Sequence, residues 1–296
     1  MSEKRATVKD IAREAGVSIA TVSYIMNNRT DVKISDQTRK KVLQVANLLN
    51  YTPSLAAKSL VTGRTNKIGI AYRMNAGKPT RSLQISNFMY RLLERLERMH
   101  YDIQFIPTEV EDTSTFAATH VDGIIAIDLP GELFSTLSNS YLVPIVTVDM
   151  IIDDSLFYQV YTDIPAALQT LLKSDPDAVV VMESYDNENY NNFIRSGVPA
   201  DRFCGISHPD EPTLKNLAGR KVIVIGAYLA MMLRPYVREE DMTVIAASET
   251  MSLISEHCRR IENDTDKKAN LTINLLLNAI DHNFSVTHRH LLPLNI

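Results

Sequence analysis

Apolar positions in the first fifty residues recur at helical spacing in three short blocks. The first block predicts a helix whose apolar face consists of Val8, Ile11, Ala12 and Ala15. Thr7 and Asp10 form a capping-box pattern before it, and Gly16 suits the left-handed position that ends a helix. Ser18 and Ser35 are typical caps of two further helices. Three short helices joined in this way predict a helix-turn-helix, which places one helix in the major groove of DNA.

The third helix carries the densest apolar stripe of this segment. We expect its buried side to consist of Val42, Leu43, Val45, Ala46, Leu48 and Leu49. The polar run at 62–66, Thr-Gly-Arg-Thr-Asn, then interrupts the apolar pattern. This run predicts a boundary between a small helical head and a larger body.

From residue 67 onward, short apolar runs typical of buried strands alternate with helical patterns. The expected strands are Lys67–Tyr72, Ile103–Pro107, 121–127, Val143–Asp149, Ala178–Met182, Val222–Ile225 and Thr243–Ala246. The expected helices among them are Leu83–His100 and Ala166–Lys173. This alternation predicts an α/β body with a parallel sheet flanked by helices.

Charge divides the chain at the same place. Residues 1–64 carry 11 Lys and Arg against 5 Asp and Glu, a net charge of +6. The other 232 residues carry 20 against 30, a net charge of −10, and the sum is the overall −4. A basic head on an acidic body suggests a module that binds a polyanion, although an ordinary solvated helical surface would also carry such charge.

The remaining composition narrows the class of protein. Cys204 and Cys258 are the two cysteines and lack metal-ligand spacing, so we expect neither a disulfide nor a zinc framework. His288 and His290, with His282 upstream, form only a weak metal-binding pattern, and we interpret them as surface residues. No apolar run approaches the roughly 20 residues that span a bilayer. We therefore expect a soluble cytoplasmic protein without metal or cofactor.

The helix-turn-helix segment resembles the lactose-repressor (LacI/GalR) family of bacterial transcription regulators. The resemblance rests on Thr7-x-Lys9-Asp10-Ile11-Ala12, Ala15-Gly16-Val17-Ser18, Thr21-Val22-Ser23, Asn27, and Tyr51-x-Pro53-x-x-Ala56-Ala57-Lys58-Ser59-Leu60. It covers about 65 residues and implies three parts. Residues 1–50 would be the DNA-binding domain, 51–66 a hinge helix and linker, and 67–296 a shortened two-lobed core, similar to periplasmic sugar-binding proteins, for effector binding and dimerisation.

The resemblance implies a role for individual residues of the head. Ile19, Ala20 and Tyr24 would face base edges, and the phosphate-contacting set would be Thr7, Ser18, Thr21, Ser23 and Asn27. The position of Tyr24 is commonly Arg in this family, so the operator sequence of a relative cannot be transferred. Packing of Ile19 and Tyr24 within the head is the alternative.

Ser54–Val61 looks like the family's hinge helix, which pairs with a second copy on DNA. Leu60 would wedge into the minor groove, and Tyr51, Ala57 and Lys58 complete the expected DNA-contacting residues. An eight-residue helix is marginal alone, so we expect it to form when paired on DNA. A plain linker helix, with Leu60 packed on the body, is the alternative.

Candidate effector-binding residues follow from positions at strand ends. They are Arg73, Asp128, Asp149, Asp163, Tyr185, Arg195, Tyr228 and Glu249. The family's Asn-Asp pair after the strand Val222–Ile225 reads Gly226-Ala227 here, so the carboxylate that binds sugar hydroxyls is missing. Asp186–Asn192 occupies the place of the family's conserved Arg, for which Arg195 is only an approximate substitute.

These observations favour a homodimeric repressor of a palindromic operator. A sugar-like effector in the interlobe cleft would modulate its affinity. The helix Leu83–Met99, which is rich in charge, would be either the dimer interface or a solvated face. The alternatives are control by a non-sugar ligand or a partner protein, and action without an effector. An enzyme with a DNA-binding head is disfavoured, because the body shows no nucleophile–base pair, phosphate-binding loop or metal cluster.

Overall fold

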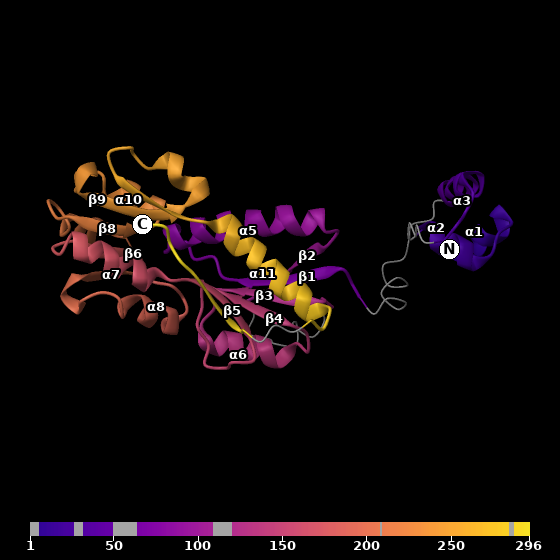
Figure 1. Ribbon diagram of the computed structural model, residues 1–296, viewed down its shortest axis with the longest axis horizontal. Coiled ribbons are helices and arrows are strands. Elements are labelled where there is room, and N and C mark those ends of the chain that lie inside the picture. The colour runs from indigo at the N-terminus through magenta and orange to yellow at the C-terminus, as the bar shows by residue number, and fades with distance from the viewer. Residues whose placement is uncertain (1–5, 27–31, 50–63, 109–119, 208, 284–286) are drawn as a thin grey trace. The chain divides into compact units, whose positions relative to one another are not determined.

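The chain divides into two compact units, residues Met1–Thr65 and Asn66–Ile296. Figure 1 shows the computed structural model, which describes residues 6–26, 32–49, 64–108, 120–207, 209–283 and 287–296. We call the described part of the first unit the head and the second unit the core. Within these ranges, no helix is long and apolar enough to cross a membrane.

The head contains the three expected helices, α1 (Val8–Ala15), α2 (Ile19–Met26) and α3 (Asp36–Leu48). They share a small apolar cluster built from Ile11, Ala12, Ala15, Val22, Ile25, Val42, Val45 and Ala46. The stripe predicted for α3 is too wide, because Leu43 is 48% and Leu48 82% exposed. Six apolar side chains in eight residues spread over more than one face of a helix, and the small core covers one face only.

The core contains two parallel sheets. The first lobe has six strands in the order β11-β5-β4-β3-β1-β2, and the second lobe has five in the order β10-β9-β8-β6-β7. The first sheet consists of β1 (Lys67–Tyr72), β2 (Asp102–Ile106), β3 (Gly123–Ile127), β4 (Ile145–Val148), β5 (Tyr158–Thr162) and β11 (Arg289–Leu292). The second consists of β6 (Val179–Glu183), β7 (Phe203–Ile206), β8 (Val222–Ile225), β9 (Met242–Ala247) and β10 (Arg259–Asn263). The predicted α/β class with parallel sheets is confirmed.

Helices cover both faces of each sheet (Figure 1). The first lobe has α5 (Pro79–Arg98) and α11 (Thr265–Ile280) on one face and α6 (Gly131–Ser140) on the other. The second lobe carries α7 (Ile164–Ser174), α8 (Glu188–Arg195), α9 (Glu211–Lys215) and α10 (Ala227–Leu233). Its single turns are η2 (Ala200–Arg202), η3 (Glu239–Asp241) and η4 (Ser248–Leu253).

The chain passes between the lobes at three places. These are the connection from β5 to α7, the connection from β10 to α11, and the segment after β11, where Leu294 packs into the second lobe. Because all strands within a lobe are parallel, their carboxyl ends gather at one edge of each sheet. The residues that follow β3, β4, β6, β8 and β10 meet across the gap between the lobes, where open α/β sheets place their binding sites.

Candidate functional site

The exposed face of α2 is the candidate DNA-contacting surface of the head. Val22 and Ile25 are buried against α1 and α3, whereas Ile19 is 50% exposed and Ala20 is also exposed. Thr21, Ser23 and Tyr24 are half-buried on the same helix. The alternative in which Ile19 packs within the head therefore does not hold in the structure, and its side chain is available to a thymine methyl.

The hydroxyl residues expected at phosphates form the caps of the two helices. The Thr7 side chain accepts from Asp10 N, and Asp10 Oδ2 accepts from the backbone N–H of Thr7 at 3.0 Å, which completes the predicted capping box. Ser18 Oγ accepts from the backbone N–H of Thr21 at 3.0 Å. The N-termini of α1 and α2 are thus ordered by side chains that are themselves exposed. Helix N-termini of this kind favour anions, including DNA phosphates.

The other predicted DNA-contacting residues lie outside the described residues. They are Asn27, Tyr51, Ala57, Lys58 and Leu60. The hinge helix proposed for Ser54–Val61 lies in the same undescribed segment. The boundaries 1–50, 51–66 and 67–296 stay predictions, although the division of the chain after Thr65 falls one residue before the expected linker end.

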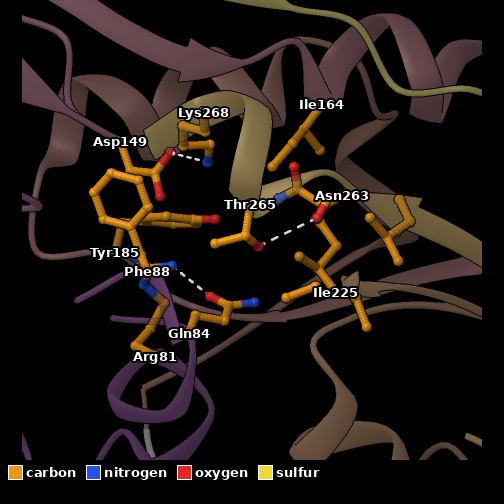
Figure 2. Close-up of a pocket in the computed structure, with 13 residues that line it drawn as sticks. Arg81, Gln84, Phe88, Asp149, Ile164, Tyr185, Ile225, Asn263, Thr265 and Lys268 are labelled. Carbon is orange, nitrogen blue, oxygen red and sulfur yellow. Dashed lines mark hydrogen bonds and ion pairs between the residues drawn. The ribbon is translucent and has the colours of Figure 1, made fainter. Parts of the chain in front are cut away.

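The candidate site of the core lies between the two lobes and is centred on Arg81, a residue that was not among the predicted site residues. Figure 2 shows this guanidinium beside Tyr185 and Gln84. Its Nε and Nη2 donate to Asp128 Oδ2 at 3.0 and 2.8 Å, and its Nη1 donates to Gln84 Oε1. The guanidinium carbon lies 3.6 Å from the ring centroid of Tyr185. Arg81 is only 4% exposed, and its side chain fills the centre of this cleft.

Asp128 links Arg81 to the second lobe. The residue follows β3, has a positive φ of 47°, and is buried. Its Oδ1 accepts from the backbone N–H groups of Asp186 at 2.9 Å and Asn187 at 3.1 Å. Oδ2 of Asp128 therefore binds Arg81 of the first lobe, and Oδ1 binds the backbone of the second lobe. Glu183 adds a further link, because its Oε2 accepts from the backbone N–H of Arg81 at 2.9 Å.

Two more ion pairs lie in or beside the cleft. Lys268 on α11 donates to Asp149 Oδ1 at 2.8 Å, and both side chains are at most 15% exposed (Figure 2). Lys78 bridges the lobes to Asp186 at 2.6 Å. Cations and carboxylates are thus paired with each other across and beside the gap, which is the arrangement that buried charges require.

Burial sets the protonation of these groups. Burial raises the pKa of Asp128 to about 6, and this effect outweighs the opposing influence of the Arg81 charge. Burial alone would lower the pKa of Arg81, but the carboxylate of Asp128 raises it further above its ordinary value. Burial also raises the pKa of Tyr185, which keeps the phenol neutral beneath the guanidinium. At neutral pH the centre of the cleft is a charged pair stacked on a neutral ring.

Little space is left for a ligand. The cavity beside Arg81 has a volume of about 30 Å³ and is lined by residues of both lobes, among them Gln84, Asp149, Tyr185, Asn263 and Thr265. That volume holds no more than a few water molecules. Sites for small-molecule ligands usually enclose roughly 300–1,000 Å³. A sugar enters only if the lobes separate or Arg81 moves.

The missing Asn-Asp pair of the sequence has a structural counterpart at Gly226. This residue follows β8 with a φ of 116°, and a Cβ added to it would lie 2.1 Å from Thr80 Cγ2. The first turn of α5 thus lies directly on the end of β8. A side chain at this position would collide with Thr80, so the first residue of the pair cannot carry one unless α5 moves.

Four of the predicted effector residues lie at the cleft. Asp149 and Tyr185 line the cavity, and Asp128 accepts hydrogen bonds from the guanidinium of Arg81. Arg73 lies at the rim, where its Nη1 is 3.9 Å from Asp186 Oδ2. They meet there because parallel strands deliver their carboxyl ends to one edge, and their role toward an effector stays a prediction.

The other four predicted effector residues lie outside the lining of this cavity. Asp163 caps α7 by accepting from Ala166 N, and Arg195 pairs with Glu188 at 3.1 Å on the surface of α8. Tyr228 is 38% exposed on α10. Glu249 pairs with Arg91 at 2.6 Å. These side chains are engaged by helix caps, surface pairs or solvent, which position in the sequence alone did not reveal.

Arg81, Gln84 and Lys268 are the site residues that the sequence prediction missed. The expected helix started at Leu83, whereas α5 starts at Pro79. Proline at the first helical position is a common start, and this signal would have placed Arg81 on the first turn. Lys268 lies on α11, a helix for which the sequence reading made no prediction.

The histidines near the end of the chain lie in or beside the edge strand β11. His290 lies 2.9 Å from the carbonyl of Thr287, and His288 packs edge-on against Tyr158. Among the described residues, no group of three or more His, Cys, Asp or Glu could hold a metal ion.

The family of the head follows from its sequence. Residues 7–54 match the model of the family described as "Bacterial regulatory proteins, lacI family". The head is therefore a lacI-family helix-turn-helix domain, and the relatives that share it are transcriptional regulators rather than enzymes.

Curated relatives match mainly this end of the chain. RegA of Clostridium acetobutylicum, an HTH-type transcriptional regulator, is 52% identical over 65 residues, which are 22% of this chain and 19% of RegA. The sucrose operon repressor of Klebsiella pneumoniae is 44% identical over 71 residues, 24% of this chain and 21% of the repressor. DegA of Bacillus subtilis is 35% identical over 132 residues, 41% of this chain and 36% of DegA. The chain spans less than half the length of each of these relatives.

Solved structures extend the likeness to the core. The Lac repressor bound to ONPG in its repressed state has a TM-score of 0.72 at 17% identity, over 99% of this chain and 98% of that one. The transcriptional regulator CelR in its cellobiose complex has a TM-score of 0.59 at 16% identity, over 98% of each chain. At these identities the likeness is one of fold, namely a helix-turn-helix head followed by two parallel-sheet lobes.

Proposed function

We propose that this protein is a sequence-specific transcriptional regulator, a repressor, that binds a palindromic operator as a homodimer. The observation that carries the proposal is the exposed α2 face, Ile19 and Ala20, on a head that matches the lacI family. A recognition helix must present side chains that its own domain does not bury, and α2 does so.

Electrostatics supports the same function. Exposed cations surround the helices of the head, namely Lys9, Arg13, Lys33, Lys40 and Lys41. Together with the capped N-termini of α1 and α2, these cations favour the phosphate backbone and give salt-dependent affinity. The net charge of −10 on the other 232 residues keeps DNA away from the core.

The homodimer is supported by an apolar groove on the first lobe. The groove has a volume of about 230 Å³ and lies between α5 and the edge strand β2. Its exposed members are Met74, Tyr90, Leu93 and Phe105. Exposed apolar side chains next to an edge strand usually indicate a protein partner, and a second copy fits because a helix-turn-helix reads two half-sites.

Control by a sugar-like effector is the less supported part of the hypothesis drawn from the sequence. The closed cleft and the loss of the Asn-Asp pair at Gly226-Ala227 support action without a sugar. A non-sugar ligand or partner protein that acts elsewhere stays the second candidate. The proposal also places the protein in the cytoplasm, where an operator is found.

A mobility-shift experiment tests the proposed function. The full chain is titrated at moderate salt onto the DNA upstream of its own gene, with a scrambled fragment of equal length as the control. We expect a shift of the upstream fragment at protein concentrations at least tenfold below those that shift the scrambled fragment. Equal affinity for both fragments, falling equally with salt, would contradict a sequence-specific regulator.

A further inference from the structure

The space between the lobes is built to hold one planar cation. Its walls are a carboxylate, Asp128, an amide oxygen, Gln84, and the face of an aromatic ring, Tyr185. A guanidinium is the cationic group that combines in-plane donors with a flat surface for stacking. A sugar hydroxyl could donate to Asp128 but would leave the charge of this buried carboxylate uncompensated, whereas a guanidinium balances it. The chemistry of the cleft is therefore that of a guanidinium site.

The occupant of this site belongs to the chain itself. Arg81 is on the first turn of α5, in the first lobe, and Tyr185 follows β6 in the second lobe. Asp128 joins the same guanidinium to the loop at Asp186 and Asn187 of the second lobe. The contacts that an effector would make with both lobes of a two-lobed receptor are here made by one side chain.

We propose that Arg81 is an effector supplied in cis, and that its occupation of the guanidinium site between the lobes holds the core closed without a small molecule. The consequence for regulation rests on the proposed function. A core whose lobes are joined by one of its own side chains keeps one geometry, so operator binding would need no inducer or corepressor at this site. The closure itself is a property of the core and can be tested without DNA.

Chemical rescue provides the test. Arg81→Ala removes the atoms of ethylguanidinium from the site and leaves a cavity of matching shape. We expect wild-type protein without additives to protect the backbone N–H groups of Asp186 and Asn187 from hydrogen exchange. Arg81→Ala should lose this protection at least tenfold, and millimolar ethylguanidinium should restore it. At about ten times its Kd, the ligand should also raise the Tm of the variant by about 3 °C.

Two controls distinguish binding of ethylguanidinium in the vacated Arg81 site from a general stabilising effect of the additive. N-ethylurea has nearly the shape of ethylguanidinium but no charge, and it should not rescue Arg81→Ala. Arg91→Ala removes another arginine of α5 that pairs across the lobes, with Glu249 at 2.6 Å, but lies outside the cavity. Ethylguanidinium should leave the exchange and Tm of Arg91→Ala unchanged. Equal rescue by N-ethylurea, or equal rescue of Arg91→Ala, would overturn the proposal.

A second variant covers the outcome in which Arg81→Ala does not fold. Arg81→Gln keeps a planar group in the cleft without its charge and fills the place of the ethyl group, so it should lose the exchange protection and should not be rescued by the ligand. If Arg81→Ala is unfolded, recovery of folded Arg81→Ala on refolding with ethylguanidinium supports the proposal, and no recovery overturns it. A failure of the mobility-shift experiment would leave these exchange and thermal readouts intact, so the two hypotheses fail separately.

Discussion

The guanidinium carbon of Arg81 lies 3.6 Å from the ring centroid of Tyr185, and the two residues come from different lobes. Asp128 accepts hydrogen bonds from the same guanidinium. Together the three side chains fill the place between the lobes where a two-lobed receptor would hold its ligand. The same contact that buries the charge of Arg81 also joins the two lobes.

Asp128→Asn should destabilise the core strongly. The variant puts an NH2 donor where both carboxylate oxygens accept, Oδ2 from Arg81 and Oδ1 from the backbone N–H groups of Asp186 and Asn187, and a buried donor without an acceptor costs about 1–3 kcal/mol. Urea unfolding monitored by fluorescence or circular dichroism measures the loss. The double variant Arg81→Met/Asp128→Leu should lose less stability than Arg81→Met and Asp128→Leu lose together. In the double variant, neither member of the pair is left buried without the other. Strict additivity would show that the two residues do not act as a pair.

The stability of the core should depend on pH through Asp128. The pKa of this group is raised to about 6 in the folded protein, against 3.8 for the ordinary residue. A raised pKa contributes stability that is complete below pH 3.8 and is lost as the pH rises through about 6. The unfolding free energy of wild type relative to Asp128→Asn should therefore be about 1 kcal/mol more favourable at pH 5 than at pH 7. A pH-independent difference between the two proteins would contradict this assignment.

Gly226→Ala should separate α5 from the end of β8. The new methyl group would meet Thr80 Cγ2 at 2.1 Å, and a φ of 116° is strained for alanine. Together these effects should cost about 2–4 kcal/mol of unfolding free energy. Adding Thr80→Ser removes the colliding methyl group, so the double variant should be more stable than Gly226→Ala. A single variant with wild-type stability would mean that this contact is not close in solution.

Ile19→Ala should weaken operator binding without unfolding the head. Its side chain is 50% exposed on α2, so little core packing is lost, whereas the lost apolar contact with a thymine methyl should weaken binding by about 1–2 kcal/mol. Fluorescence anisotropy with the operator fragment measures the change. Leu48→Ala, which removes another exposed aliphatic side chain of the head, should bind normally. Equal losses for both variants would remove α2 from the recognition surface.

Phe105→Lys should prevent dimerisation. Phe105 is 50% exposed on the edge strand β2, and a charge placed there must be desolvated when a second copy packs against the groove. Size-exclusion chromatography with light scattering should show a dimer for wild type and a monomer for the variant. Leu156→Lys, on a residue that is 78% exposed and outside the groove, should stay dimeric. A dimeric Phe105→Lys would place the interface elsewhere.

Leu60→Ala tests the hinge, which remains a prediction from sequence. If Leu60 wedges into the minor groove, the variant should lose on the order of a few kcal/mol of specific affinity and keep its salt-dependent non-specific binding. Anisotropy titrations with operator and scrambled DNA separate the two. Equal losses on both DNAs would contradict the wedge.

Local patterns in the sequence were sufficient for the head and for the class of the core. Caps and apolar spacing located α1, because Thr7, Asp10 and Gly16 each act within a few residues of one another. Buried strands such as β8 were visible as continuous apolar runs. Half-exposed strands such as β7 and β11 were not, because most of their residues are exposed or half-buried and give no continuous buried apolar run.

The sequence by itself determined that this protein carries a helix-turn-helix and a parallel α/β body, because both depend on local spacing and on hydrophobic burial. Its resemblance to the family also implies that the Asn-Asp pair is replaced by Gly226-Ala227. Only the tertiary structure decided what fills the cleft instead. Arg81, Asp128 and Tyr185 are separated by up to 104 residues along the chain. Their meeting depends on how the two lobes pack together, and no local pattern in the chain encodes that distance.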